Sequence, residues 1–296
     1  MSRATVGSVE LEYETRGDAS DPALLLVMGL GAQLVSWDDG FCDGLVDRGF
    51  FVIRFDNRDI GLSTKTPGTP PSVESVVMSR FSGQKPDVPY LLADMAEDAF
   101  GVLDALGIRQ AHLVGASMGG MIVQSMAIAH PERVLSLTSI MSTTGDLTVG
   151  QADMSLLTQI WAVQTTDPAK AVDAGVAVGR LISGPLFDEG RSRQITERSV
   201  ERCFHPDGVA FQTAAIFASP DRTPQLRELR VPTLVVHGRV DPLVPLSGGE
   251  ATAQAIPGAK LLVIEDMGHD LPVPPVSTWA TVINAIGELA QVPATA

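Results

Sequence analysis

Ala111-His-Leu-Val-Gly-Ala-Ser-Met-Gly119 is the stretch of sequence that decides the fold. Its first four residues form an apolar run of strand length, and residues 121–129 (Met-Ile-Val-Gln-Ser-Met-Ala-Ile-Ala) are apolar and rich in helix formers. Between them lies a G-x-S-x-G motif, the tight strand-to-helix bend that projects a serine oxygen into a site. The bend forces its central residue towards positive φ, so its neighbours must be small. The order strand, bend, helix predicts that Ser117 is a nucleophile and not an incidental turn residue.

Composition limits the classes of partner. The chain has 296 residues, 45% of them hydrophobic, and its formal charge of −14 would repel nucleic acid and anionic membrane surfaces. The first residues lack the apolar segment of a signal peptide, and no run is long enough to span a membrane, which favours a cytoplasmic protein. Cys42 and Cys203 show no metal-ligand spacing. We therefore expect a small-molecule partner, no nucleic acid, no membrane, no metal and no cofactor; the oligomeric state stays open.

The hydrophobic pattern predicts a doubly wound α/β sheet. Residues 9–15 alternate apolar with polar, as an antiparallel edge strand does, whereas later strands are continuous apolar runs typical of a parallel sheet covered on both faces. The expected parallel strands are residues 23–28, 50–55, 112–114, 135–141, 233–236 and 261–264. The expected helices that alternate with them are residues 36–48, 90–106, 118–130, 246–255 and 276–289.

This alternation breaks after the fourth of the long parallel strands. Residues 143–223 are far longer than a single crossover requires, so we interpret them as an inserted cap subdomain on a core of residues 1–142 and 224–296. An insertion here would lie above the carboxyl ends of the strands, where ligands bind in such sheets. A proline-rich stretch, residues 67–89, is expected to form an irregular loop at the same rim.

A serine nucleophile requires a base and an acid that orients the base. Of the five histidines, His269 follows the last predicted strand in Gly268-His269, where the chain order nucleophile, acid, histidine expects the base. The other four are better explained by structural roles at strand ends, helix ends or turns: His112, His130, His205 and His237. Asp241, in the loop after the preceding strand, is the preferred acid, although an Asp-Pro turn is the alternative. The other acids weighed, Asp221, Asp266 and Asp270, precede the strand or lie too near His269.

The oxyanion of the transition state requires backbone donors. One should be the N–H of Met118, which follows the nucleophile, and the other the N–H of Leu30 in Met28-Gly-Leu-Gly31, after the first parallel strand. The alternative for residues 28–31 is an ordinary strand-to-helix turn.

Together these residues resemble the α/β-hydrolase superfamily along essentially the whole chain. The likeness rests on the Ser117 elbow, His130-Pro-Glu-Arg-Val134, Gly238-Arg-Val-Asp-Pro242, Gly268-His269 and residues 54–63, which look like the family turn that supports the oxyanion loop. Met28 and Asp59 depart from the family pattern, because many members have histidine and glycine there. Within the superfamily, the chain resembles bacterial carboxylesterases of the aclacinomycin methylesterase type.

The resemblance and the residues both imply a serine hydrolase that cleaves carboxylic esters through an acyl-enzyme intermediate. Lactonase, thioesterase, perhydrolase and carbon–carbon bond hydrolase activities remain open because they use the same three residues, and a ligand receptor with little turnover is the alternative from another class. The substrate is expected to be small to medium and largely apolar. Candidate pocket residues, which core packing would equally explain, are Met141, Met154, Trp161, Phe204 and Phe211.

Overall fold

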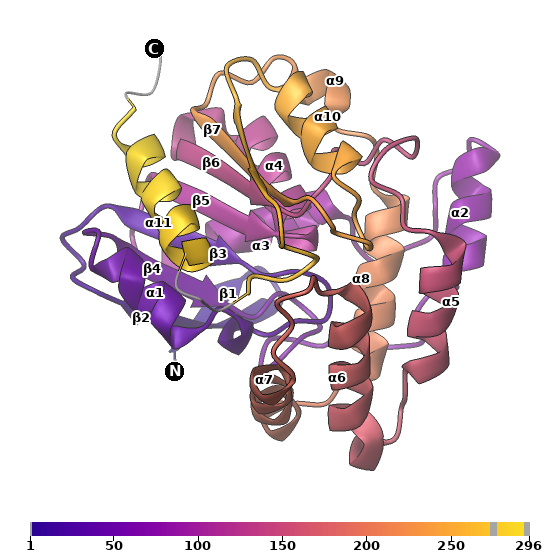
Figure 1. Ribbon diagram of the computed structural model, residues 1–296. Coiled ribbons are helices and arrows are strands. Elements are labelled where there is room, and N and C mark those ends of the chain that lie inside the picture. The colour runs from indigo at the N-terminus through magenta and orange to yellow at the C-terminus, as the bar shows by residue number, and fades with distance from the viewer. Residues whose placement is uncertain (1, 273–276, 293–296) are drawn as a thin grey trace.

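The computed structural model describes residues 2–272 and 277–292 and is built around an eight-stranded sheet (Figure 1). The strand order is β1-β2-β4-β3-β5-β6-β7-β8. From β4 to β8 all neighbouring strands are parallel, whereas β2 is antiparallel to both β1 and β4. The strands are β1 Ser2–Val6, β2 Val9–Arg16, β3 Ala23–Val27, β4 Phe51–Phe55, β5 Ala111–Ala116, β6 Val134–Ile140, β7 Thr233–Gly238 and β8 Lys260–Ile264. The predicted mostly parallel α/β sheet is confirmed.

The antiparallel edge differs from the prediction by one strand. β2 was expected at the edge, but β1 lies outside it and pairs from Ser2 opposite Tyr13 to Val6 opposite Val9. Gly7, at φ 59°, makes the tight turn between the two strands. Only Ala4 of β1 is fully buried, so this strand lacks the strong apolar alternation that would have identified it.

Helices cover both faces of the sheet, and alternate strand residues supply the two cores. Leu25, Ile53 and Leu113 belong to the core on one face, while their neighbours Leu24 and Val52 belong to the core on the other. The core helices are α1 Asp39–Val46, α3 Leu92–Ala105, α4 Met118–Ala129, α9 Thr223–Leu226, α10 Ser247–Ala255 and α11 Ser277–Ala290.

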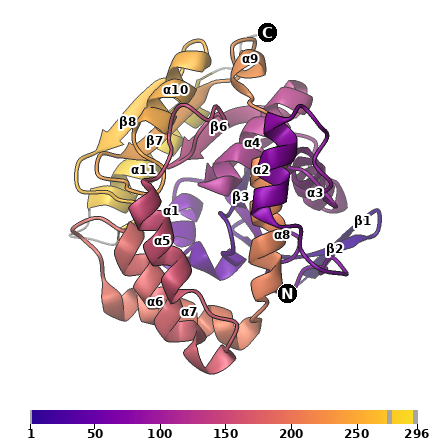
Figure 2. The same cartoon turned by 90° about the vertical axis from the view of Figure 1, so that its right-hand side faces the viewer.

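Four further helices follow β6, within the segment expected to form the cap. They are α5 Met154–Val163, α6 Ala171–Ile182, α7 Glu189–Arg202 and α8 Pro206–Ala218, and they group at one side of the sheet (Figures 1 and 2). Two of them begin after an aspartate whose side chain accepts from a backbone N–H of the first turn: Asp153 before α5 and Asp188 before α7. Asp167 caps in the same way the short 3-10 helix Pro168–Lys170, which leads into α6. The limits of the cap as a subdomain remain a prediction.

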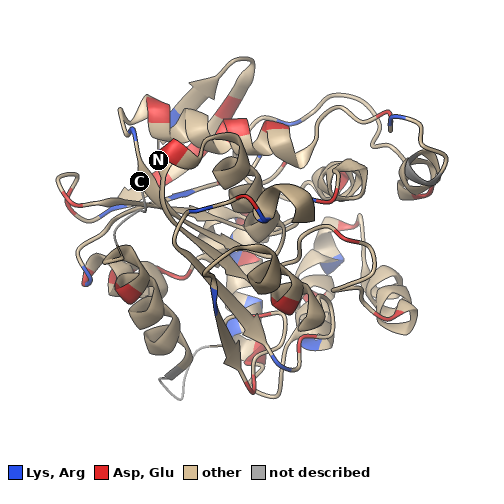
Figure 3. Cartoon of the chain, turned by 90° about the horizontal axis from the view of Figure 1, so that it is seen from above, with Lys and Arg blue, Asp and Glu red and all other residues tan. Residues whose placement is uncertain are grey.

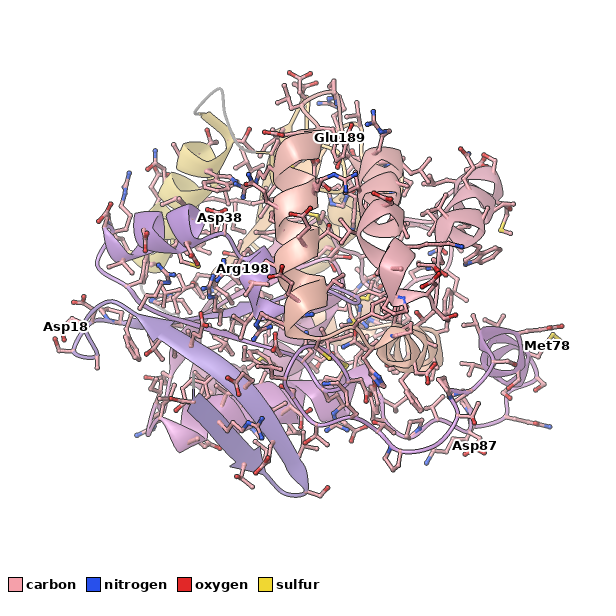
Figure 4. The ribbon with its side chains drawn as sticks, turned by 90° about the horizontal axis from the view of Figure 1, so that it is seen from below. Asp18, Asp38, Met78, Asp87, Glu189 and Arg198 are labelled. Atoms are coloured by element: carbon pink, nitrogen blue, oxygen red, sulfur yellow. The ribbon has the colours of Figure 1, made fainter. Side chains whose placement is uncertain are left out.

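The proline-rich stretch is not wholly irregular. Residues 73–81 form α2, and Val76 of this helix is buried against Ala214 and Ala218 of α8. Met78 lies on the outer side of α2 and is 62% exposed (Figure 4). The prolines on either side of α2 concealed it, because they mark turns and leave a short apolar segment between them.

The acidic residues are not gathered at one place in the sequence or on one element (Figure 3). Asp and Glu are spread over many helices and loops in the view from above (Figure 3), in keeping with 35 acidic against 21 basic residues. In the described ranges, none of the helices has the length and apolar character needed to cross a bilayer.

His112 is a buried histidine in the middle of the sheet. Its Nδ1 lies 2.8 Å from the hydroxyl of Ser136, and its ring packs edge-on against Phe50. Burial lowers the pKa of His112 to about 4, because the charged imidazolium would lose its hydration.

We expect this histidine to weaken the fold in mild acid. In the unfolded chain His112 takes up a proton near pH 6.5, whereas in the folded chain it stays neutral down to about pH 4. The unfolded state therefore binds more protons in this window, and stability present above pH 6.5 falls by up to about 3 kcal/mol as the pH drops towards 4. Urea unfolding of wild type and His112→Gln at pH 7.5 and 4.5 measures this, since all other groups titrate alike in both proteins. Equal losses in the two proteins would contradict the assignment.

Candidate active site

Ser117 sits at the bend between β5 and α4 in the strained backbone conformation expected of an elbow. Its φ is 56° and its ψ is −120°, and its N–H donates to the carbonyl of Ile140 at 2.9 Å. A Cβ on Gly115 would lie 2.2 Å from the carbonyl oxygen of Gly119, and one on Gly119 would lie 2.0 Å from that of Val27. Only glycine fits at either position, because real Cβ atoms stay at least 3.0 Å from other heavy atoms and the backbone leaves less room here.

The structure brings the three predicted catalytic side chains into one hydrogen-bonded chain. Ser117 Oγ lies 2.8 Å from His269 Nε2, and His269 Nδ1 lies 2.8 Å from Asp241 Oδ2. A carboxylate only accepts, so Nδ1 carries the proton, and Nε2 is left to accept the serine hydroxyl. Asp241 is held in turn by the N–H groups of Leu243 and Val244, each 2.9 Å from Oδ1. This arrangement can move a proton from the serine to the imidazole.

A second histidine lies beneath this chain. His237 is fully buried, and its Nε2 donates to the carbonyl of Val244 at 2.7 Å while lying 3.7 Å from Asp241 Oδ2. Burial lowers the pKa of His237, so the ring is neutral and does not form an ion pair with Asp241 in competition with His269. Sequence reasoning assigned His237 a structural role but did not foresee its place next to the acid.

The loop predicted to hold one oxyanion donor runs beside the nucleophile. A Cβ on Gly29 would lie 3.0 Å from Ser117 Cβ and 3.6 Å from its Oγ. Leu30 follows, and within residues 2–272 and 277–292 its N–H has no hydrogen-bond acceptor. Met118 is the first residue of α4, where N–H groups have no acceptor within the helix. The roles of Leu30 and Met118 as donors remain predictions.

The turn after β4 supports this loop. Asn57 Nδ2 donates to the carbonyl of Met28 at 2.9 Å, and the buried Asp56 carboxylate accepts from the N–H groups of Leu34 at 2.7 Å and Leu62 at 2.9 Å. Arg202, at the end of α7, adds an ion pair of 3.1 Å to Asp56. Helix α7, within the segment predicted to form the cap, is thus attached to the support of the loop by an ion pair whose carboxylate is fully buried.

The segment predicted to form the cap also holds the loop that carries His269. The N–H of His269 donates to the carbonyl of Ile182 at the end of α6, at 2.8 Å. A Cβ on Gly268 would lie 2.2 Å from the nitrogen of Gly184, so the two backbones touch. Asp270, an acid that sequence reasoning ranked below Asp241, accepts from Gly268 N–H at 3.2 Å, and burial raises its pKa.

The five candidate pocket residues differ widely in how deeply they are buried. Met141 directly follows β6 at φ 43° and is buried, and Phe211 of α8 is buried in the core cluster that includes α3 and α4. Phe204 is half-buried, whereas Met154 and Trp161 of α5 are 62% and 57% exposed. Their roles in a pocket remain predictions.

Two residues that contact the loops of the site were not predicted from the sequence. They are Arg202 of α7, which is partly buried, and Gln212 of α8, which is fully buried, and both contact the loops that flank the site. Gln212 had one available signal, a single glutamine within the apolar run Val209-Ala-Phe-Gln-Thr-Ala-Ala-Ile-Phe217. A polar side chain inside such a helix needs a partner.

Among the described residues, no group of three His, Cys, Asp or Glu side chains is placed to hold a metal ion.

Known proteins share this architecture along nearly the whole chain. Residues 22–273 match the family model described as alpha/beta hydrolase fold. Rhodomycin D methylesterase DauP of Streptomyces sp. (strain C5) is 30% identical, with 91% of this chain and 92% of that protein covered. 3-Oxoadipate enol-lactonase 2 of Acinetobacter baylyi is 28% identical, with 88% and 87% covered.

Solved structures agree on the fold. The crystal structure of the enol-lactonase from Burkholderia xenovorans LB400 superimposes with a TM-score of 0.75 at 22% identity, covering 98% of this chain and all of that one (100%). With the family model spanning most of the sequence, this chain belongs to the alpha/beta hydrolase family.

Proposed function

We propose that the chain is a serine esterase in which Ser117 is the nucleophile, His269 the general base and acid, and Asp241 the residue that orients His269. The chain is a carboxylic ester hydrolase, as its methylesterase relatives and its fold indicate. The observation that supports the roles best is the continuous hydrogen-bonded chain from Asp241 through His269 to a serine held at positive φ.

The reaction proceeds in two steps. Ser117 Oγ attacks the ester carbonyl while His269 Nε2 takes its proton, and the imidazolium is stabilised by Asp241 across the 2.8 Å contact. The negative oxygen that forms is stabilised by the N–H groups of Leu30 and Met118. His269 then protonates the departing alcohol, and a water activated by the same nitrogen releases the acid from the acyl-enzyme.

The relatives suggest the range of substrates. Two are rhodomycin D methylesterases of Streptomyces, which supports a methyl ester or another ester of a small alcohol. A lactonase is the second candidate, because 3-oxoadipate enol-lactonase 2 is 28% identical over most of its length and a lactone is an internal ester open to the same attack.

A labelling experiment tests this function directly. We expect a fluorophosphonate probe to modify Ser117 in the folded protein, and short p-nitrophenyl esters to be hydrolysed. Peptide mapping by mass spectrometry locates the label, and Ser125→Ala is the matched control because Ser125 lies on α4 with its hydroxyl bonded to Met121. A folded protein that remains unlabelled and inactive would instead indicate a ligand receptor built on a hydrolase fold.

A further inference from the structure

Gln212 connects a cap helix to the oxyanion loop. It lies in the middle of α8 and is fully buried. Its Oε1 accepts from the N–H of Gly31 at 2.9 Å, and its Nε2 donates to the carbonyl of Arg58 at 2.9 Å. Both ends of the amide therefore bind backbone groups, one in the oxyanion loop and one in the turn that supports it.

Residues of α8 close to Gln212 also pack tightly against these two loops. A Cβ on Gly31, which has φ 71°, would lie 3.1 Å from Val209 Cγ2. A Cβ on Gly208 would lie 2.2 Å from the carbonyl oxygen of Asp59. Residues 208, 209 and 212 lie near one another on a helix, so one face of α8 packs closely on both loops.

These contacts fix the oxyanion loop on both sides of Leu30. Asn57 holds the loop at the carbonyl of Met28, two residues before Leu30, and Gln212 holds it at the N–H of Gly31, one residue after. The Leu30 N–H belongs to the single peptide plane, Gly29–Leu30, between the two peptides that these hydrogen bonds hold, so its direction depends on both attachments. Without Gln212 the N–H of Gly31 would lose its acceptor, and the loop would lose the side-chain hydrogen bond that follows Leu30 directly.

From this geometry we infer that Gln212 is a positioning residue for the oxyanion hole, acting through the backbone of Gly31 and Leu30. The inference rests on the proposed esterase function. Gln212 touches neither Ser117 nor His269 in the hydrogen-bond network, so its effect is on the transition state and not on the proton transfer. Through Gln212, the rate of the chemical step depends on α8, which lies in the segment predicted to form the cap.

The test is the kinetics of Gln212→Met, which keeps the length of the side chain and removes both hydrogen bonds. Removing one oxyanion donor outright costs roughly 10²–10³ in rate, so a displaced donor should lower kcat for p-nitrophenyl acetate about 10- to 100-fold. KM should change by less than about twofold, because ground-state binding does not use the oxyanion donors. The midpoint of the pH profile of kcat/KM should stay in place, because the contacts of His269 are intact. Inhibition by phenylboronic acid, whose tetrahedral adduct places an oxygen in the hole, should weaken by a similar factor.

Two further variants separate this role from a merely structural one. Gln124→Met removes an equally buried glutamine, on α4, whose amide binds Ser139 and Arg222 away from the oxyanion loop, so it should lose stability but keep kcat. Gln212→Glu keeps an acceptor for Gly31 and should recover part of the kcat lost in Gln212→Met. If Gln212→Met does not fold, Gln212→Asn carries the test, since its shorter amide cannot bridge Gly31 and Arg58, and the same loss of kcat is expected.

The inference is overturned by an unchanged kcat in a folded Gln212→Met or Gln212→Asn protein, by a rise in KM alone, or by an equal loss of kcat in Gln124→Met. Its failure is distinct from failure of the esterase function. If only the role of Gln212 is wrong, the wild-type protein still hydrolyses the ester and Ser117 is still labelled. If the esterase function is wrong, neither happens.

Discussion

Replacing Ser117 with alanine should lower kcat for ester hydrolysis by roughly 10⁴–10⁶-fold while the protein stays folded. Alanine keeps the Cβ that already occupies the positive-φ position, so the elbow is not disturbed further, and only the oxygen 2.8 Å from His269 is lost. Replacing His269 with alanine should cost a similar factor, because a serine without its base is a weak nucleophile. The double variant should be little worse than either single one, since the two groups act as a unit. Initial rates with p-nitrophenyl acetate at saturating substrate measure all three.

Ser125→Ala, on the outer part of α4, is the control and should keep wild-type kcat. If Ser117→Ala or His269→Ala kept wild-type turnover, the assignment of these residues would be wrong. If only Asp241→Asn kept it, the acid alone would need another candidate.

The core of the site was predictable because each of its signals is local. The elbow is five consecutive residues whose small side chains and positive φ belong to one bend. Asp241 follows the buried strand β7, His269 follows the partly exposed edge strand β8, and the carboxyl ends of parallel strands meet at one edge of the sheet. Chain order and strand position were therefore enough to select both side chains.

The supports of the site were not predictable in the same way. Gln212 is 181 positions from Gly31 and 154 from Arg58 in the sequence, so nothing near it indicates its partners. Arg202 stands in a strongly polar helix, α7, where another arginine, Arg193, pairs with the exposed carboxylate of Asp173. The pairing of Arg202 with the buried Asp56 depends on how α7 packs on the loop after β4, which periodicity does not encode.

The glycines of the elbow illustrate how packing overrides local preference. Gly119 lies in the first turn of α4, and helix propensity alone predicts that alanine would stabilise this position by about 1 kcal/mol. In the structure the added Cβ would lie 2.0 Å from the carbonyl oxygen of Val27 and 2.9 Å from that of Met28. Both are backbone atoms of the segment that leads from β3 into the oxyanion loop, so no rotamer change relieves the overlap.

Gly119→Ala should therefore reduce the free energy of unfolding by more than about 4 kcal/mol or abolish soluble expression. Gly287 provides the matched control, because it is also helical, in α11, and the nearest atom to an added Cβ is Arg48 Nη1 at 4.0 Å. Gly287→Ala should raise the free energy of unfolding by about 0.5–1 kcal/mol, the conformational cost of a helical glycine. Guanidinium denaturation of the two variants measures the difference, and a Gly119→Ala protein as stable as Gly287→Ala would show that α4 can move away from β3. Such a movement would displace Ser117 from the loop that carries Leu30, so any folded Gly119→Ala protein should also be a poor esterase.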